Sequence, residues 1–288
     1  MPVNGKKWDR RVARARELAG TYPFVKQVLL FYSRLTAFQS TLYFQLCSAC
    51  ASGNSVNRAL PAALDEVDLA HLLTCWRPFL LLIEAEAPSP LAGFARGLKA
   101  SGPDAVAALL RASWPANLPA AIEADAGAQT AAGPRAELDP FEHFCAQAFL
   151  QPYAEFLADH AEVPAPPLRR PFCPYCGSSP VAGVLRPEGE GAKRSLVCSF
   201  CRTEWDYLRI ACPACDERRE EKLCVYTAPK FEAVRVEACG TCKAYILTVD
   251  LTKNGLAVPE VDTLAAIPLT LWANEKGHHK ITRNILCL

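Results

Sequence analysis

Apolar side chains recur at steps of three and four residues through the first half of the chain, the spacing that places them on one face of an α-helix. The stretches with this spacing are 23–47, 60–86, 104–111 and 137–159. Residues 123–134 are rich in alanine and glycine and are predicted to form a loop. From Trp8 to His160 the pattern therefore predicts an all-helical domain with interruptions.

The pattern changes at Val163–Pro167, where three prolines stand within four positions. Proline removes a backbone donor and clashes with the preceding turn, so a helix cannot continue through this segment. Beyond it the apolar runs are short and β-prone, and they lie at 194–197, 207–210, 234–237 and 245–251. The predicted divisions are a helical domain in 1–162, a proline-rich linker in 163–171, one module in 172–210, and a second module with a C-terminal extension in 211–288.

Four Cys-x-x-Cys pairs lie beside these predicted strands. They are Cys173/Cys176, Cys198/Cys201, Cys212/Cys215 and Cys239/Cys242. A gap of two residues lets both sulfurs of a tight turn reach one metal ion, and two such turns close a tetrahedral tetrathiolate site around zinc or iron. The sequence therefore predicts eight metal ligands and two metal ions.

The four pairs form an internal duplication. The first and third pairs align at an offset of 39 residues, and the second and fourth align at an offset of 41. The 21 and 23 residues that separate the pairs within each copy fit a ribbon hairpin, whereas ten residues separate the copies. We therefore expect two tandem rubredoxin-like or zinc-ribbon modules after the helical domain, with an interleaved pairing as the alternative. Sheets this short bury little apolar surface, so each ion should contribute on the order of 10 kcal/mol to folding.

The residue after the second cysteine of a pair should adopt a positive φ at the end of the turn. Gly177 suits this position because it has no Cβ, and Asp216, at the equivalent place in the second copy, tolerates it less readily. A closed set of four thiolates leaves no vacant position for a hydrolytic water, so we expect no metal-centred catalysis. One-electron redox chemistry at an iron tetrathiolate stays open, because electron transfer needs no vacant position.

Composition and charge limit the domain number, the binding partners and the cellular compartment that are expected for this chain. With 288 residues and 51% hydrophobic content, the chain suits two domains. Its 31 basic and 30 acidic residues give no broad positive field, which disfavours binding to nucleic acid or anionic membranes. No apolar run predicts a secretory signal or a membrane span. Fourteen cysteines in such a chain indicate a reducing compartment, so we expect a cytoplasmic protein without membrane insertion.

Other candidate residues are interpreted as structural. Cys47 and Cys50 form a fifth pair near the end of a predicted helix, where buried core thiols are favoured over a redox or metal role. Cys224 and Cys287 are single and are expected to be packed thiols. The segment Gly277–Lys280 is expected to be a polar turn rather than a metal site.

Two other functional classes compete with a metal-bound accessory factor. A thiol–disulfide oxidoreductase would use one reactive Cys-x-x-Cys pair, although such enzymes have a βαβ frame that this pattern lacks. A nucleic-acid-binding zinc ribbon would stack bases on aromatic side chains and pair phosphates with basic ones. The residues available for that role are Phe200, Arg202, Trp205, Tyr207 and Arg209.

Several blocks of sequence carry a family resemblance. They are Pro171–Pro180, Cys198–Trp205, Cys212–Cys215, Glu237–Ile246, Arg14–Ala19 before Tyr22–Phe24, and the ending Arg283–Leu286. On these blocks the chain resembles the formate dehydrogenase accessory protein family. The most specific block is the second, in which two cysteines are followed by Thr-Glu-Trp.

The resemblance implies a cytoplasmic, non-catalytic factor that a respiratory formate dehydrogenase requires for its activity. It implies binding to the catalytic subunit of that enzyme during maturation. It also implies rubredoxin-like iron centres on the eight paired cysteines, which match one by one. Iron is therefore favoured by the resemblance, while zinc remains the alternative because a tetrathiolate site accepts both.

Overall fold

The computed structural model describes residues 5–51, 64, 66–114, 139–161, 169–283 and 286. The chain folds as two compact units. The sheet unit comprises Met1–Thr36, Val163–Pro174 and Ser178–Leu288, and the helical unit comprises Ala37–Glu162 and Tyr175–Gly177. The N-terminal 36 residues thus group with the cysteine-rich half. The division expected from the sequence, into 1–162, 163–171, 172–210 and 211–288, stays a prediction.

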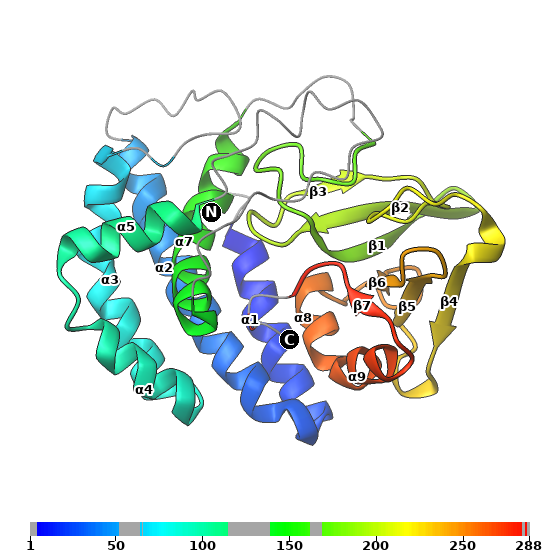
Figure 1. The fold of residues 1–288 in the computed structure, drawn as a ribbon, viewed down its shortest axis with the longest axis horizontal. Helices are drawn as coiled ribbons and strands as arrows, with labels where there is room; N and C mark the ends of the chain where they lie inside the picture. The colour runs from blue at the N-terminus through cyan, green and yellow to red at the C-terminus, as the bar shows by residue number, and fades with distance from the viewer. Residues whose placement is uncertain are drawn as a thin grey trace. The chain divides into compact units, whose positions relative to one another are not determined.

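The first part of the described chain is helical, as the apolar spacing predicts (Figure 1). The elements are α1 Gly5–Thr21, η1 Pro23–Val25, α2 Lys26–Ala51, α3 Glu66–Glu86, α4 Ser89–Leu98, α5 Pro103–Ser113 and α7 Pro140–His160. The expected loop at 123–134 lies outside the described residues. None of the helices in the described part of the chain is both long and apolar enough to cross a bilayer.

Aromatic packing forms the core of the helical unit. The rings of Trp76 and Phe149 meet edge to face at 5.0 Å, and Phe79 lies 5.3 Å from Phe149. All three side chains are buried. Such pairs contribute about 0.5–1.5 kcal/mol each beyond the area they bury. The apolar stripe of α7 is therefore joined to that of α3.

The second part of the described chain forms one seven-stranded sheet. Its strands are β1 Pro180–Glu188, β2 Gly191–Cys198, β3 Glu204–Asp206, β4 Leu223–Thr227, β5 Val234–Cys239, β6 Ala244–Asp250 and β7 His279–Lys280. The order is β3-β2-β1-β6-β5-β4, and β7 pairs with β6. The predicted α plus small β fold with two ribbon modules is confirmed, and the two ribbons share a single sheet.

The ribbons join where β1 and β6 pair in parallel, with Val184 opposite Val249. Gly183 pairs with Thr248 at this junction. A Cβ atom on Gly183 would come within 2.3 Å of Thr248 Oγ1, so the close approach of the strands requires glycine here. All other pairings among the strands, except β6 with β7, are antiparallel.

Three of the four predicted strands are confirmed as β2, β5 and β6, and one is wrong. Residues 207–210 follow β3 rather than forming a strand. The amide of Tyr207 still donates to the carbonyl of Arg194 at 3.1 Å, after which the chain turns toward the third cysteine pair. The sequence did not indicate β1, which contains Pro180, Gly183 and Pro187, residues that are disfavoured in strand interiors.

Two C-terminal helices complete the sheet unit. They are α8 Pro259–Ala265 and α9 Ile267–Glu275, which contact β1, β5 and β6 (Figure 1). Val236, Leu247 and Val249 of the sheet belong to one buried cluster with Ala266 and Leu269. The sheet therefore has an apolar core of its own, made in part by residues far along the chain from the cysteine pairs.

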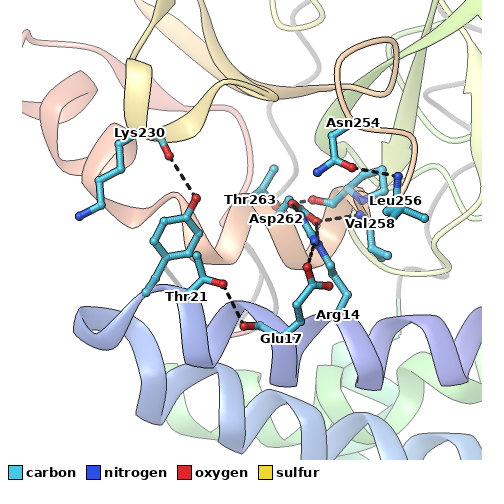
Figure 2. Close-up of polar contacts among 11 residues, drawn as sticks. Arg14, Glu17, Thr21, Lys230, Asn254, Leu256, Val258, Asp262 and Thr263 are labelled. Atoms are coloured by element: carbon cyan, nitrogen blue, oxygen red, sulfur yellow. Dashed lines mark hydrogen bonds and ion pairs between the residues drawn. The ribbon is translucent and has the colours of Figure 1, made fainter.

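Helix α1 is fixed to α8 by a buried ion pair (Figure 2). Arg14 Nη2 lies 2.6 Å from Asp262 Oδ1, and Arg14 Nε lies 3.1 Å from Asp262 Oδ2. The two side chains are 9% and 6% exposed. Asp262 Oδ2 also accepts the Val258 amide at 2.7 Å, and Glu17 binds the remaining Arg14 nitrogen at 2.7 Å. The hydrogen bond with Asp262 raises the pKa of Arg14.

Replacing Arg14 with methionine should destabilise the sheet unit, because Asp262 would stay buried without its partner. The expected loss is about 3 kcal/mol of unfolding free energy, the lower part of the range for a broken buried pair. Urea unfolding followed by tryptophan fluorescence measures it. Arg16→Met on the exposed face of the same helix is the control and should change stability by less than about 0.5 kcal/mol. Equal losses in the two variants would contradict the prediction.

Candidate metal centres

The eight paired cysteines gather into two clusters. The first centre comprises Cys173, Cys176, Cys198 and Cys201, and the second centre comprises Cys212, Cys215, Cys239 and Cys242. Within each centre the four sulfur atoms lie within 4.8 Å of one another. The grouping is that of two tandem ribbons rather than an interleaved one. That these sulfurs bind metal stays a prediction.

The sulfur spacing fits a tetrahedral ion. Contacts of 3.4 Å join Cys173 to Cys201, and contacts of 3.7 Å join Cys212 to Cys242 and Cys215 to Cys239. A tetrahedron with metal–sulfur bonds of about 2.3 Å has edges of about 3.8 Å. Each centre is therefore capable of holding one zinc or iron ion with little movement of its sulfurs.

All four turns share one backbone conformation. The residue after the second cysteine of each pair has a positive φ: 63° at Gly177, 58° at Arg202, 56° at Asp216 and 63° at Lys243. The expectation for Gly177 and Asp216 is confirmed. Arg202 and Lys243 were not anticipated, because neither side chain favours the left-handed region. The turn geometry is thus imposed by the cysteines and their surroundings rather than by local preference.

Backbone hydrogen bonds close three of these turns. The amides of Cys173, Cys198 and Cys212 each donate to the carbonyl five residues later, at 2.9 Å in every case. Two further amides point at sulfur: Phe200 N lies 3.3 Å from Cys198 Sγ, and Ala214 N lies 3.4 Å from Cys212 Sγ. Donors directed at sulfur favour the thiolate form, which is the form that binds metal.

Burial disfavours the deprotonated, thiolate form of the cysteines in the second centre. Burial raises the pKa of Cys212, and it raises the pKa of Cys242 to about 11. At Cys239 burial also raises the pKa, but hydrogen bonds with the amides of Cys242 and Thr241 and with the thiols of Cys242 and Cys215 together outweigh it, so that the pKa of Cys239 is lowered. A cation bound among these sulfurs would supply the charge that keeps all four deprotonated.

The side chain of Arg194, in β2, binds the segment between the two centres and a residue of β5. Its Nη1 donates to the carbonyls of Leu208 at 2.8 Å and Ala211 at 3.2 Å, and its Nη2 binds Glu237 Oε2 at 2.7 Å. Its guanidinium also lies over the ring of Tyr207 at 5.4 Å. β2 ends at Cys198 of the first centre and Ala211 precedes Cys212 of the second, so this one buried side chain connects the segments that carry these two cysteines.

Among the described residues, neither cluster includes any of the remaining cysteines. Cys47 is half-buried in α2, and the Cys50 side chain lies outside the described residues, as does Cys287. Cys224 is exposed on β4, contrary to the expectation of a packed thiol. Cys145, which the sequence did not single out, is buried in α7, and burial raises its pKa to about 12.

His278 and His279 contact Lys243, the residue after Cys242, but neither belongs to the four-cysteine cluster of the second centre. His278 Nδ1 is 3.2 Å from the carbonyl of Lys243, and the amide of His279 donates to the same carbonyl at 2.9 Å. His279 belongs to β7 and pairs with Ala244 of β6. The prediction of a polar turn over Gly277–Lys280 is therefore wrong for His279 and Lys280, which form β7.

The side chains that could have stacked on nucleic acid are mostly buried. Phe200, Trp205 and Tyr207 are 3%, 7% and 6% exposed. Trp205 Nε1 donates to the carbonyl of Arg170 at 2.8 Å, and Arg209 donates to the carbonyl of Ala192 at 2.6 Å. These residues form the ribbon core and its rim, which disfavours a nucleic-acid-binding surface.

Comparison with known proteins relates the cysteine-rich part to one family. Residues 172–209 match the family model described as "FdhE, central domain". The "Protein FdhE homolog" of Aquifex aeolicus is 33% identical over 149 residues, 51% of this chain and 53% of that protein. The homolog of Pseudomonas putida is 32% identical over 162 residues, 54% of this chain and 49% of that protein. The chain thus spans about half the length of these curated relatives.

The fold is similar over nearly the whole chain to a solved structure, "The crystal structure of the FdhE protein from Pseudomonas aeruginosa". The TM-score is 0.67 at 22% sequence identity, and the match covers 98% of this chain and 95% of that one. At this identity the likeness bears on the fold alone. It includes the helical part, for which the expected family resemblance rested on few residues.

The full chain should bind two equivalents of metal, one in each centre. Cys198→Ser and Cys239→Ser should each bind one equivalent, because each removes one buried ligand from a different centre. Cys75→Ser, in the helical unit, is the control and should bind two. Elemental analysis by mass spectrometry measures the ratio of metal to protein. A chain purified from its own host with no bound metal would contradict the prediction.

Proposed function

We propose that the chain, which is similar to FdhE proteins in sequence and fold, is a non-catalytic accessory factor that a respiratory formate dehydrogenase requires for its activity. It binds the catalytic subunit of that enzyme in the cytoplasm during maturation and holds two metal ions on its eight paired cysteines. The observation that carries the proposal is the pair of four-cysteine clusters within a fold similar to that of an FdhE protein.

The geometry of the clusters supports a binding role over a catalytic one. Four sulfurs within 4.8 Å of one another supply a full tetrahedral set, so a bound ion has no vacant position at which to activate water. The ions are therefore structural or serve one-electron transfer. The helical unit and the ribbons then supply the surface that contacts the client.

The arrangement of sulfurs also favours metal binding over thiol–disulfide exchange. An oxidoreductase uses the two cysteines of one Cys-x-x-Cys pair, with a lowered thiol pKa. Here the sulfur contacts of Cys173 with Cys201 and of Cys212 with Cys242 join different pairs. Burial raises the pKa of Cys212, which further opposes a role as an attacking thiolate.

We assign iron to both centres, as the family resemblance implies. Protein purified without oxygen from its own host and then oxidised in air should show a red absorption from ferric iron bound to thiolates, because such sites have ligand-to-metal charge transfer. Absorption spectroscopy together with elemental analysis checks this. A colourless protein with two equivalents of zinc would assign zinc instead and would contradict the iron assignment.

Deleting the gene should abolish formate oxidation while the formate dehydrogenase polypeptide remains present, because the enzyme would be made but not matured. Enzyme assays and immunoblots of cell extracts measure the two quantities. Expression of the wild-type chain or of Cys75→Ser should restore activity, and a tagged chain should copurify with the catalytic subunit. Normal formate oxidation in the deletion strain would refute the proposal.

A further inference from the structure

The two centres differ in the exposure of their cysteine residues. In the first centre Cys173, Cys198 and Cys201 are 4%, 0% and 3% exposed, and Cys176 is half-buried. In the second centre Cys215 is exposed and Cys242 is half-buried. Ligand exchange at a metal ion begins when an incoming donor reaches the ion beside one of its ligands. Cys215, the one exposed residue among the eight paired cysteines, therefore offers an incoming donor a route to the ion that the buried cysteines do not.

The difference follows from side chains inside the Cys-x-x-Cys pairs. The residue before the second cysteine is aromatic in both pairs of the first centre, Tyr175 and Phe200, and small in both pairs of the second, Ala214 and Thr241. Phe200 is 3% exposed and Tyr175 is half-buried, whereas Ala214 and Thr241 are exposed. Small side chains at these positions cover less of the neighbouring cysteine than aromatic rings would.

Charged residues, rather than apolar ones, surround the open side of the second centre. Glu217 Oε2 accepts Thr241 Oγ1 at 2.6 Å and so joins the two turns that hold the ion. Arg219 binds Glu217 at 2.7 Å and Arg218 binds Asp216 at 2.8 Å, with both arginine side chains more than 60% exposed. Water and polar donor groups can approach such a rim without displacing an apolar cover.

We propose that the second centre is a ligand-exchange site and that Cys215 is the ligand that leaves the metal ion. An incoming soft donor, a thiolate of a partner protein, forms a bond to the ion as the bond to Cys215 Sγ breaks. The released thiolate then takes a proton from water, and the oxidation state of the ion does not change. The first centre keeps its ion. The inference rests on the metal-binding part of the proposed function.

Metal release from the full chain tests this inference. The chain is loaded with two equivalents of zinc, which has no redox chemistry, and mixed with an excess of a chromogenic chelator. One equivalent should be released at least about tenfold faster than the other, because opening of a solvent-exposed site needs less local unfolding. Release of both equivalents in a single phase would overturn the inference.

Alkylation identifies the centre that releases first. Iodoacetamide added after the fast phase should label the four cysteines of the second centre, and peptide mass spectrometry locates the label. Label on the cysteines of the first centre instead would overturn the assignment. This measurement uses the wild-type chain and so does not depend on the folding of a variant.

Matched substitutions test whether the size of the side chain before the second cysteine sets the rate of metal release. Ala214→Tyr should slow the fast phase, because it places in the second centre the side chain found in the first. Tyr175→Ala, at the equivalent position of the first centre, should speed the slow phase. An unchanged fast phase in Ala214→Tyr would overturn the inference that access to Cys215 sets the rate.

The metal-release experiment and the gene deletion test different claims, so each can fail without the other. Two phases of release from a chain whose deletion leaves formate oxidation normal would refute the proposed function alone. Equal release rates from a chain whose deletion abolishes formate oxidation would refute the ligand-exchange inference alone.

Discussion

Both centres depend on the turn that brings the two sulfurs of a Cys-x-x-Cys pair toward one point. Each turn reverses sharply enough to place the next residue in the left-handed region, even where that residue is Arg202 or Lys243. A non-glycine residue there carries a conformational cost on the order of 1 kcal/mol or more, which the surroundings must offset. Hydrogen bonds from backbone amides to carbonyl oxygens and sulfurs offset part of this conformational cost, and a bound cation would offset the remainder.

The two centres are parts of one structure rather than independent modules. The parallel pairing of β1 with β6 merges the ribbons into one sheet, and Gly183 permits the close approach at that seam. Arg194 adds a second connection, because it binds both the segment between the ribbons and Glu237 of β5. The two centres are therefore connected both by the strand pairing and by the hydrogen bonds of Arg194.

Sequence patterns predicted the helices of the first half, the cysteine grouping and three strands because these features have local causes, whereas α8 and α9 were not predicted. The apolar stripe of α2 and the spacing of the cysteine pairs are readable from neighbouring residues alone. The merged sheet was not predictable in this way, since β1 contains two prolines and a glycine whose role appears only when Thr248 lies opposite Gly183. The same holds for the pairing of Arg14 with Asp262, which are far apart in the sequence. Contacts of this kind depend on the tertiary fold and have no local signature.

The shared core changes what the metal ions have to do. An isolated ribbon buries too little apolar surface to fold without its ion, and the sequence alone suggested that each ion supplies much of the folding free energy. In the structure β1, β5 and β6 pack with α8 and α9 around a common apolar cluster, and α1 adds a buried ion pair. This core stabilises the sheet independently of either centre. The second centre, with its exposed sulfur, can therefore lose or exchange a ligand without unfolding the sheet that positions the other three, which an isolated ribbon could not do.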